Sequence, residues 1–369
     1  MWTFLLPTRV TFGDGASAGV REAAARLGAR PLLVTDATLS RLPHIQALQA
    51  RLPEAPVFTE VEPNPTVANV DALAERIRVH QADVLVAIGG GSALDCAKAA
   101  ACLCRHRDTS VRPFHSEGRA FGTERIPLIA IPTTAGTGSE VTPFAVLNDP
   151  EKGVKGPIAS ESLYPTLALV DPELTHSLPV AVSAATGLDA LCHAIEGYWS
   201  RNHQPVCDLL AIEAARLVFA NLATVLAQPD DAKARNAMSY AALLAGMAFQ
   251  LPKNAMVHAC SFPLSNRYHL PHGVACALTL EGAIRLNAPC LGDRFAAFAT
   301  ACGFADAEAM AAAVHRLKRL GGLPCTLAEA GIPENAVETL IAESFHPLLQ
   351  NNPRPITSAD LRALYRELM

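Results

Sequence analysis

The chain has 369 residues, half of them hydrophobic, and a formal net charge of −5 from 30 basic and 35 acidic side chains. This length allows a large buried core and favours two domains over one. Because lysine and arginine are scattered and aromatic residues make up only 5% of the chain, the basic patch and stacking residues of a nucleic-acid-binding protein are missing, and we expect no nucleic-acid partner.

The opening of the chain predicts a strand rather than a targeting segment. Residues 1–15 are apolar only briefly, lack a basic start, and reach Pro7 and Arg9 too early for the apolar core of a signal peptide. No later segment holds about eighteen uninterrupted apolar residues, the length that suggests a membrane-spanning helix. We therefore expect a soluble protein with no membrane partner.

The first half of the chain alternates short apolar runs with helical patterns. The apolar runs predict buried strands at residues 32–35, 57–61, 84–88, 128–131 and 167–170. The helical patterns between them lie at residues 19–27, 43–51, 66–80 and 92–104. This order predicts a Rossmann-like α/β domain over residues 1–180, with a doubly wound, mostly parallel sheet that binds its ligand beyond the carboxyl ends of the strands.

The character of the chain changes from about Val182 onward, where strand-like runs disappear. Alanine-rich amphipathic patterns predict helices at residues 181–199, 206–227, 231–249, 274–286, 306–320 and 358–368. We therefore expect an all-helical second domain over residues 181–369, with the domain boundary at the change of composition near residue 180.

A glycine-rich turn follows the expected strand at residues 84–88. Gly89, Gly90, Gly91 and Ser92 lead into a helical pattern, where small residues let a pyrophosphate approach and free N–H groups attract its charge. Ser92 and Asp95 also form an S-x-x-D pattern typical of a capping box. The turn is not a G-x-G-x-x-G fingerprint, and a tight strand-to-helix turn without a ligand is the structural alternative.

Two further stretches indicate a dinucleotide. Asp36 directly follows the predicted strand LLVT, where its carboxylate can accept hydrogen bonds from a ribose diol. The same carboxylate would repel a 2′-phosphate, so this residue favours NAD over NADP. A role as a helix N-cap is an equal alternative. Residues 132–140, PTTAGTGSE, place Thr133, Thr134 and Thr137 among glycines in a loop suited to phosphate or carboxamide oxygens. Lys155 can reach a ribose or phosphate, although a solvated lysine is the usual case.

The second half begins with a carboxylate and an imidazole one helical turn apart. Asp189 and His193 stand at i and i+4, so both project from one face of a helix, and Glu196 lies on that face, where it can hydrogen-bond a ligand. His258 and His272 follow further along the chain. One carboxylate and three imidazoles suit Fe(II) or Zn(II) better than Mg or Ca, whereas Asp189 and His193 alone would more often be a polar stripe on a solvated helix.

The ten cysteines form no C-x-x-C pair and lie mostly inside apolar, alanine-rich patterns. They are interpreted as buried thiols, with no part in the metal site. Without disulfide-like spacing or a signal peptide, a reducing, cytoplasmic compartment is expected.

Four motifs, in this order and spacing, closely resemble the iron-containing (group III) alcohol dehydrogenases over nearly the whole chain: GGGSALDCAKAAA, PTTAGTGSEVTPFAVLND, GLDALCHAIEGY and VHACSFPLSNRYHLPHGVACAL. The family fold is an α/β domain followed by a helical domain, usually in a homodimer or larger assembly. The resemblance implies that the metal ligands are Asp189, His193, His258 and His272. It also implies a dinucleotide site lined by Gly90, Gly91, Ser92, Thr133, Thr134, Thr137 and Lys155, with Asp36 as the NAD-selecting aspartate and Asn64 on the adenosine side.

The implied activity is reversible hydride transfer between NAD(H) and a small primary alcohol or its aldehyde, on Fe(II) or Zn(II). No catalytic residue is assigned beyond the metal ligands. Many members have a histidine where this chain has Phe262, so any proton relay through that histidine is absent, which leaves water, a ribose hydroxyl or His269. The SFPL stretch around Phe262 resembles that of reductases of anionic, phosphonate-type aldehydes.

Other interpretations stay open at this point. Chemistry of the wider dehydroquinate synthase-like superfamily fits the same ligands, although the GTGSE loop and the PHG at residues 271–273 fit the alcohol dehydrogenases better. A metal-dependent hydrolase or lyase would use the same ligands without a redox cofactor, and the PTTAGTGSE loop argues against it. A third interpretation is a non-catalytic NAD-sensing protein. The intact set of four candidate ligands argues against it, because such a protein would not need them.

Overall fold

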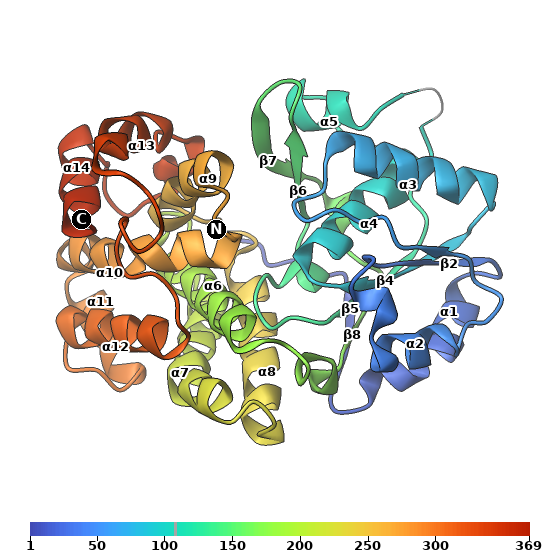
Figure 1. The fold of residues 1–369 in the computed structure, drawn as a ribbon, viewed down its shortest axis with the longest axis horizontal. Coiled ribbons are helices and arrows are strands. Elements are labelled where there is room, and N and C mark those ends of the chain that lie inside the picture. Colours follow the sequence, from blue (N-terminus) through green and yellow to red (C-terminus); the bar gives the residue numbers. More distant parts are fainter. Residues whose placement is uncertain (107–108) are drawn as a thin grey trace. The chain divides into compact units, whose positions relative to one another are not determined.

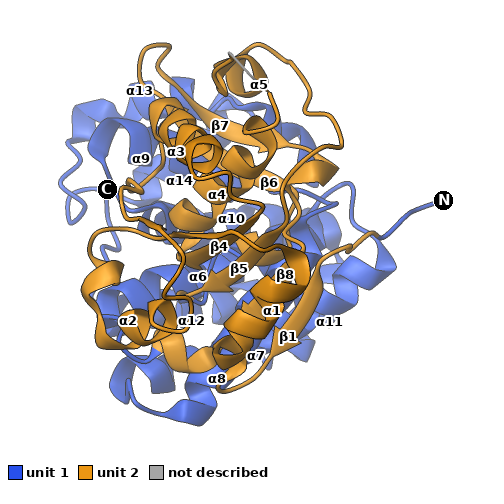
Figure 2. Cartoon of the chain, turned by 90° about the vertical axis from the view of Figure 1, so that its right-hand side faces the viewer, with its two compact units in different colours: residues 1–4, 135–138, 176–369 blue, residues 5–134, 139–175 orange. Residues whose placement is uncertain are grey.

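The computed structural model describes residues 1–106 and 109–369, which form two compact units (Figures 1 and 2). Unit 1 comprises residues 1–4, 135–138 and 176–369, and unit 2 comprises residues 5–134 and 139–175. Four residues of the threonine- and glycine-rich loop, 135–138, therefore belong to unit 1, whereas the residues on both sides of them belong to unit 2. The boundary that we expect near residue 180 stays a prediction.

Unit 2 is built on a six-stranded sheet in the order β1-β8-β5-β4-β2-β3, in which all neighbouring strands are parallel. The strands are β1 (Arg9–Phe12), β2 (Pro31–Val34), β3 (Val57–Phe58), β4 (Val84–Gly89), β5 (Leu128–Pro132) and β8 (Leu167–Val170). The expected Rossmann-like α/β architecture is confirmed. The sheet places the residues that follow β4 and β5 side by side, because these two strands are neighbours.

Helices cover both faces of this sheet, which explains the continuous apolar runs of its central strands. Along β4, Val84, Val86 and Ile88 pack into the core shared with α1 (Val20–Leu27) and α2 (Pro43–Gln49). Leu85 and Ala87 point to the opposite face, into the core shared with α3 (Val67–Val79) and α4 (Gly91–Leu103). Successive side chains of a strand alternate between faces, so one strand supplies two cores.

Four details of unit 2 differ from the sequence-based expectation. The opening strand begins only at Arg9, and β3 ends at Phe58, beyond which an isolated bridge between Asp36 and Glu60 continues the pairing. A short helix, α5 (Arg112–Ser116), and an antiparallel hairpin, β6 (Phe144–Asp149) with β7 (Val154–Ala159), were not predicted. The inner side chains of the hairpin alternate with partly exposed ones, so it lacks the fully apolar signal of the central strands.

Unit 1 is helical throughout its described residues, as the loss of strand-like patterns predicts, and it has one continuous hydrophobic core. Its helices are α6 (Val180–Trp199), α7 (Pro205–Ala227), α8 (Ala232–Phe249), α9 (Met256–Tyr268), α10 (His272–Leu291), α11 (Asp293–Ala301), α12 (Ala307–Leu320), α13 (Val337–Glu343) and α14 (Ser358–Glu367). The described residues also include seven short 3-10 helices: η1 (Ala16–Gly19), η2 (Leu39–Arg41), η3 (Ser139–Val141), η4 (Glu161–Leu163), η5 (Pro172–Thr175), η6 (Glu334–Ala336) and η7 (Pro347–Asn351).

The helices α9, α11 and α13 were not predicted, and α10 is longer than the pattern suggested. Pro263 lies inside α9 and Pro289 inside α10. A proline in mid-helix removes a backbone donor and usually ends a helix, so α9 was missed from the sequence and the predicted helix at residues 274–286 was ended too early. Tertiary packing overrides that preference, since α10 packs against α6, α9 and α12 in the core of unit 1.

Two helices, α7 and α10, are long and apolar enough to cross a membrane by length and composition alone. Helix α10 is mostly buried in the core of unit 1, and α7 packs against α6 and α8. Core helices of soluble proteins pass the same test, so two such helices are weak evidence for a membrane span.

Candidate metal centre and dinucleotide site

Helix α6 presents Asp189 and His193 from one face, as their spacing predicts. The helix is apolar along most of its length and buried almost entirely, so its few polar side chains project into the interior of unit 1. Asp189 is only 2% exposed and His193 only 4%. The His193 ring stacks on Phe249 with 4.2 Å between ring centroids, which fixes the plane of the imidazole.

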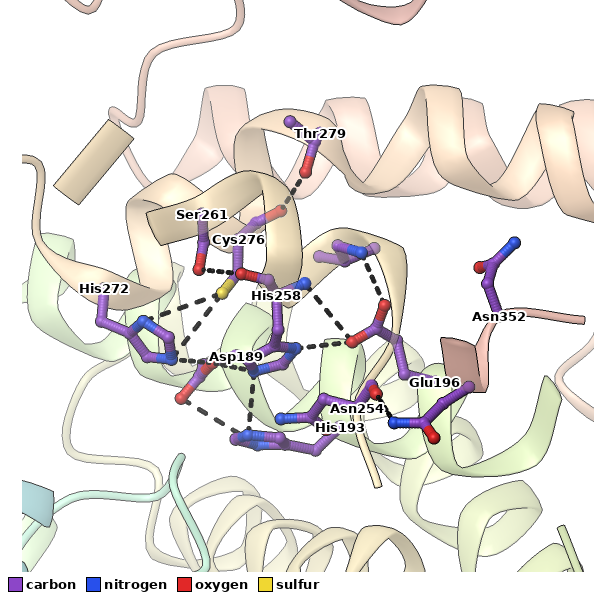
Figure 3. A network of polar contacts seen from close by, with 12 residues as sticks. Asp189, His193, Glu196, Asn254, His258, Ser261, His272, Cys276, Thr279 and Asn352 are labelled. Carbon is purple, nitrogen blue, oxygen red and sulfur yellow. Dashed lines mark hydrogen bonds and ion pairs between the residues drawn. The ribbon is translucent and has the colours of Figure 1, made fainter. Parts of the chain in front are cut away.

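Helices α9 and α10 bring two more imidazoles to the same point (Figure 3). The Nε2 atom of His258 lies 3.1 Å from Nε2 of His193 and 3.7 Å from Oδ1 of Asp189. The Nε2 atom of His272 lies 3.6 Å from the same Oδ1, and Nδ1 of His193 lies 4.0 Å from Oδ2. The four side chains named from the sequence are therefore gathered in one place, inside unit 1.

Glu196 orients one of these imidazoles from behind (Figure 3). Its Oε2 lies 2.6 Å from Nδ1 of His258, and its Oε1 accepts from the backbone N–H of Val257 at 2.6 Å. A proton held on Nδ1 by the carboxylate leaves the Nε2 lone pair of His258 facing Asp189 and His193. The expectation that Glu196 hydrogen-bonds a neighbouring ligand side chain is confirmed.

The electrostatics of the cluster favour a cation. Burial raises the pKa of Asp189 to about 6, with His258 and Cys276 acting in the opposite direction. Burial, followed by repulsion from His258 and His272, lowers the pKa of His193 well below its ordinary value, so this imidazole is neutral, the form that binds metals.

One buried atom of the cluster, Oδ1 of Asp189, has no hydrogen-bond partner. Such buried polar atoms are costly unless something satisfies them. A divalent ion would satisfy the buried Asp189 oxygen, and a mixed oxygen and nitrogen set fits Fe(II) or Zn(II).

The cluster contains a thiol that the sequence interpretation assigned to the hydrophobic core. The donor atoms of Asp189, His258, His272 and Cys276 all lie within 4.8 Å of one another. The missed signal is the i, i+4 spacing of His272 and Cys276 on α10, which repeats the spacing of Asp189 and His193 on α6.

Phe262 and His269, the two residues considered for the proton path, both belong to the segment of α9 and its C-terminal end. The Phe262 ring contacts the ring of His346 at 4.6 Å between centroids, and burial lowers the pKa of His346. His269 is exposed and takes a left-handed conformation, φ 56°, as the residue that ends α9. Its role is that of an ordinary helix-end residue.

In unit 2, the glycine turn and the threonine loop meet at the ends of β4 and β5. The N–H of Thr133 donates to the carbonyl of Gly89 at 3.0 Å. A Cβ atom on Gly90 would come within 3.3 Å of the Thr134 side chain, so the glycine permits this approach. Helix α4 begins at Gly91, directly after the turn, which leaves its first N–H groups available to a phosphate.

Three more residues of the expected dinucleotide site contact one another. The N–H of Asn64 donates to Oγ of Ser92 at 3.2 Å, and Nζ of Lys155 donates to Oδ1 of Asn64 at 3.0 Å. Lys155 comes from the unpredicted hairpin, so only the fold brings it beside the start of α4. This arrangement groups Asn64, Ser92 and Lys155 at the same edge of the sheet.

Asp36 and Thr137 stand apart from that group. Oδ1 of Asp36 accepts from the N–H groups of Thr38 and Leu39 at 2.8 and 2.9 Å, so this carboxylate serves as a local cap. The capping alternative is therefore observed, and the contact with a ribose stays a prediction. Thr137 belongs to unit 1, whereas the other expected dinucleotide residues belong to unit 2.

A buried lysine fastens the threonine loop to α4, and the sequence interpretation missed it. Nζ of Lys98, whose side chain is fully buried, donates to the carbonyl of Ser139 at 2.9 Å and lies 3.3 Å from Oδ1 of Asp95. Asp95 in turn accepts from Oγ of Ser139 at 2.5 Å and from the N–H of Val146 at 2.8 Å. Asp95 was expected in a capping box with Ser92; this was wrong, because its carboxylate is turned to the loop.

Replacing Lys98 with methionine should destabilise the protein by about 3–5 kcal/mol, because it leaves the mostly buried Asp95 carboxylate without its cationic partner. We also expect a raised KM for NAD, since Ser139 would lose its anchor. Urea unfolding and steady-state kinetics measure the two effects. Lys152→Met is the matched control, since Lys152 pairs with Glu117 on the surface, and it should change stability by less than about 1 kcal/mol. Equal effects of both substitutions would contradict the anchoring role.

Glu140, in the same loop, makes stability depend on pH. Burial raises its pKa from 4.5 to about 7, although its own N–H and Lys98 act in the opposite direction. The folded state therefore holds a proton that the unfolded chain releases, so the stabilisation is complete below pH 4.5 and is lost as the pH rises through about 7. At pH 8, Glu140→Gln should be more stable than the wild type by up to about 3 kcal/mol. Unfolding free energies at several pH values test this, and parallel pH profiles for the two proteins would refute it.

The two units together define a class of protein: a parallel α/β unit with a glycine-rich strand-to-helix turn, and a helical unit with a buried site for a divalent ion. This is the organisation of a metal-dependent enzyme that uses a dinucleotide. Comparison with known proteins identifies the family.

Residues 7–172 match the family model of iron-containing alcohol dehydrogenases, and residues 183–369 match that of the C-terminal part of the same family. The chain is 36% identical to the 1-propanol dehydrogenase PduQ of Salmonella typhimurium and 33% identical to the NAD-dependent methanol dehydrogenase of Bacillus methanolicus, in both cases over the whole of each chain. The crystal structure of sulfoacetaldehyde reductase from Bifidobacterium kashiwanohense in complex with NAD+ superposes with a TM-score of 0.95 at 42% identity, covering 100% of this chain and 98% of that one.

The chain belongs to the iron-containing alcohol dehydrogenase family. It is an enzyme of this iron type, an NAD-linked alcohol dehydrogenase or aldehyde reductase, and the resemblance stated from its motifs is confirmed.

Proposed function

We propose that the enzyme interconverts a small primary alcohol and its aldehyde, with Asp189, His193, His258 and His272 as the ligands of its catalytic metal ion. The observation that carries this proposal is the convergence of one buried carboxylate and three imidazoles on one point, with Oδ1 of Asp189 lacking any hydrogen-bond partner. When bound, the ion supplies Lewis acidity toward the substrate oxygen.

The chain's own residues prepare this site. Asp189 supplies negative charge, and the neutral His193 offers a lone pair rather than a competing proton. Glu196 holds the proton of His258 on Nδ1, so that Nε2 stays available as a ligand atom. Phe262 cannot donate or accept a proton, so it would not relay the proton of the alcohol, and we assign no part in the relay to the exposed His269.

NAD(H), when bound, would supply or accept the hydride. We assign its site to the residues predicted from the sequence: Asp36, Asn64, Gly90, Gly91, Ser92, Thr133, Thr134, Thr137 and Lys155. The contacts among the glycine turn, the threonine loop and Lys155 support the phosphate end of this site. Asp36 is assigned to the ribose diol and to the exclusion of NADP. We further propose that residues 1–180 form the dinucleotide domain and residues 181–369 the metal and substrate domain.

Three properties complete the proposal. The metal is Fe(II), with Zn(II) as the alternative that the same ligands accept. The compartment is the cytoplasm, which agrees with ten cysteines that are all free thiols. The enzyme is a homodimer or larger homo-oligomer, as the family resemblance implies, and light scattering coupled to gel filtration tests this.

A second candidate is the reduction of an anionic aldehyde. Two observations favour it: the overall likeness to a sulfoacetaldehyde reductase at 42% identity, and the SFPL stretch around Phe262. Comparing kcat/KM for sulfoacetaldehyde with kcat/KM for propanal decides between the candidates. A preference for propanal supports the small neutral alcohol, and a preference for sulfoacetaldehyde supports the anionic substrate.

The central experiment loads the metal-free protein with Fe(II) or Zn(II) and follows NADH absorbance with a panel of short aldehydes. Turnover that requires the added metal supports the proposal, whereas silence across all metals and aldehydes, with the fold intact, refutes it. Titration of NADH fluorescence separates the proposal from a hydrolase or lyase, because such an enzyme has no reason to bind the dinucleotide. Light scattering and metal analysis of the same sample give the assembly and the metal content.

A further inference from the structure

Cys276 lies in the metal centre rather than in the surrounding apolar core. It is fully buried on α10, one helical turn after His272 (Figure 3). Its Sγ lies 3.8 Å from Nε2 of His272, and it falls within 4.8 Å of donor atoms of Asp189 and His258 as well. The thiol therefore belongs to a group of four side chains that share one small volume.

A second feature of this group points to a ligand. Oδ1 of Asp189 is buried, lacks a hydrogen-bond partner, and lies 3.7 and 3.6 Å from the Nε2 atoms of His258 and His272. These two imidazoles belong to the same group as Cys276. A cation placed among the four donors would neutralise the carboxylate and would lie close to the thiol sulfur.

The spacing of the donors suits direct coordination by sulfur. Typical zinc bonds are about 2.1 Å to nitrogen and about 2.3 Å to sulfur, so two ligand atoms at an angle of about 90–110° on one ion lie about 3.1–3.6 Å apart. The distance of 3.8 Å between Sγ of Cys276 and Nε2 of His272 is close to the upper end of this range.

Other buried cysteines of unit 1 do not have this setting. Cys260, on α9, faces the hydroxyl groups of Tyr365 and Ser344. Cys192, on α6, is fully buried but is not one of the four members of the group. Cys276 is thus distinguished by its position among ligand side chains, and not by burial alone.

We infer that Cys276 is an additional ligand of the metal centre, which binds Zn(II) or Co(II) as a thiolate beside the four proposed ligands Asp189, His193, His258 and His272. This inference rests on the metal centre proposed above and adds a sulfur ligand to it. On binding, the S–H bond loses its proton to water and a metal–sulfur bond forms, with no change of oxidation state. Thiolate is a soft ligand, so the site should bind Zn(II) and Co(II) more tightly than a site with only nitrogen and oxygen ligands would.

The test is a spectroscopic titration of the full-length, metal-free protein with Co(II). A thiolate ligand gives an intense thiolate-to-cobalt charge-transfer band in the near ultraviolet, in addition to the weak visible bands of the ion. We expect this band in the wild type, saturating at one equivalent of cobalt, and its loss in Cys276→Ser. Zn(II) affinity, measured by competition with a chromophoric chelator, should fall at least about tenfold in Cys276→Ser.

Cys260→Ser is the matched control, since it removes an equally buried thiol of unit 1 and should keep the charge-transfer band. Circular dichroism of each variant shows whether the helices are intact, and Cys276→Ala provides a second variant without a polar replacement. One equivalent of bound cobalt with weak visible bands and no charge-transfer band would overturn the inference and leave the proposed function standing. Failure to bind any cobalt would overturn both, and a band that persists in both Cys276 variants would exclude Cys276.

Discussion

Asp189→Ala is expected to abolish tight metal binding and to lower kcat/KM by at least about 10³-fold, which corresponds to about 4 kcal/mol of transition-state stabilisation. Asp189 is the sole carboxylate among the four proposed ligands, and its Oδ1 lies near the ligand nitrogens of both His258 and His272. Removing it takes away the only carboxylate among the proposed ligands and leaves the three imidazoles and the Cys276 thiol to hold the ion. Metal analysis after dialysis and NADH-linked aldehyde reduction measure the two losses.

Asp189→Asn keeps the volume of the side chain and one oxygen, so it should bind metal more weakly than the wild type and more tightly than Asp189→Ala. Asp149→Ala is the matched control, since Asp149 is equally buried but pairs with Arg112 in unit 2. Asp149→Ala should lower the free energy of unfolding, but each folded molecule of this variant should still bind one equivalent of metal. A full equivalent of tightly bound metal in Asp189→Ala would remove this residue from the ligand set.

Gly273→Ala is expected to destabilise the protein by about 1–3 kcal/mol or more and to weaken metal binding as well. A Cβ atom at this position would lie 2.2 Å from the carbonyl oxygen of Ala185 and 2.7 Å from its carbonyl carbon. Both obstructing atoms are backbone atoms of α6, so no side-chain rotation relieves the clash. The start of α10 must therefore move away from α6, and the adjacent His272 moves with it away from Asp189.

Urea unfolding measures the first effect, and competition with a chelator measures the second. Gly122→Ala is the control, because a Cβ atom there meets nothing within 4 Å, and it should leave both properties unchanged. If Gly273→Ala unfolds at the same urea concentration as the wild type and binds metal equally well, the close approach of α10 to α6 is not needed to form the site.

The two predictions depend on different kinds of information. The role of Asp189 follows from its spacing to His193, because residues four apart on a helix share a face whatever surrounds the helix. The need for glycine at position 273 follows only from the contact with Ala185, which is far away along the chain. No local pattern distinguishes this glycine from one that ends a loop.

Several features of the protein were determined by the sequence alone. The alternation of apolar runs and helical patterns predicted the parallel sheet of unit 2, because strands buried on both faces are apolar throughout. The loss of such runs after about Val182 predicted the helical part. The four residues proposed as metal ligands, one aspartate and three histidines, were named from helical spacing and from the family motifs, and the structure gathers them in one place.

Other features were decided only by the tertiary structure. Cys276 and Lys98 lie in alanine-rich helical patterns, where a thiol or a single lysine cannot be distinguished from ordinary core or surface residues. Their surroundings come from segments distant in the chain: Cys276 meets Asp189, and Lys98 meets Ser139. Local sequence specifies periodicity and backbone preference, whereas the partners of a buried polar group depend on which distant segments the folded core brings against it.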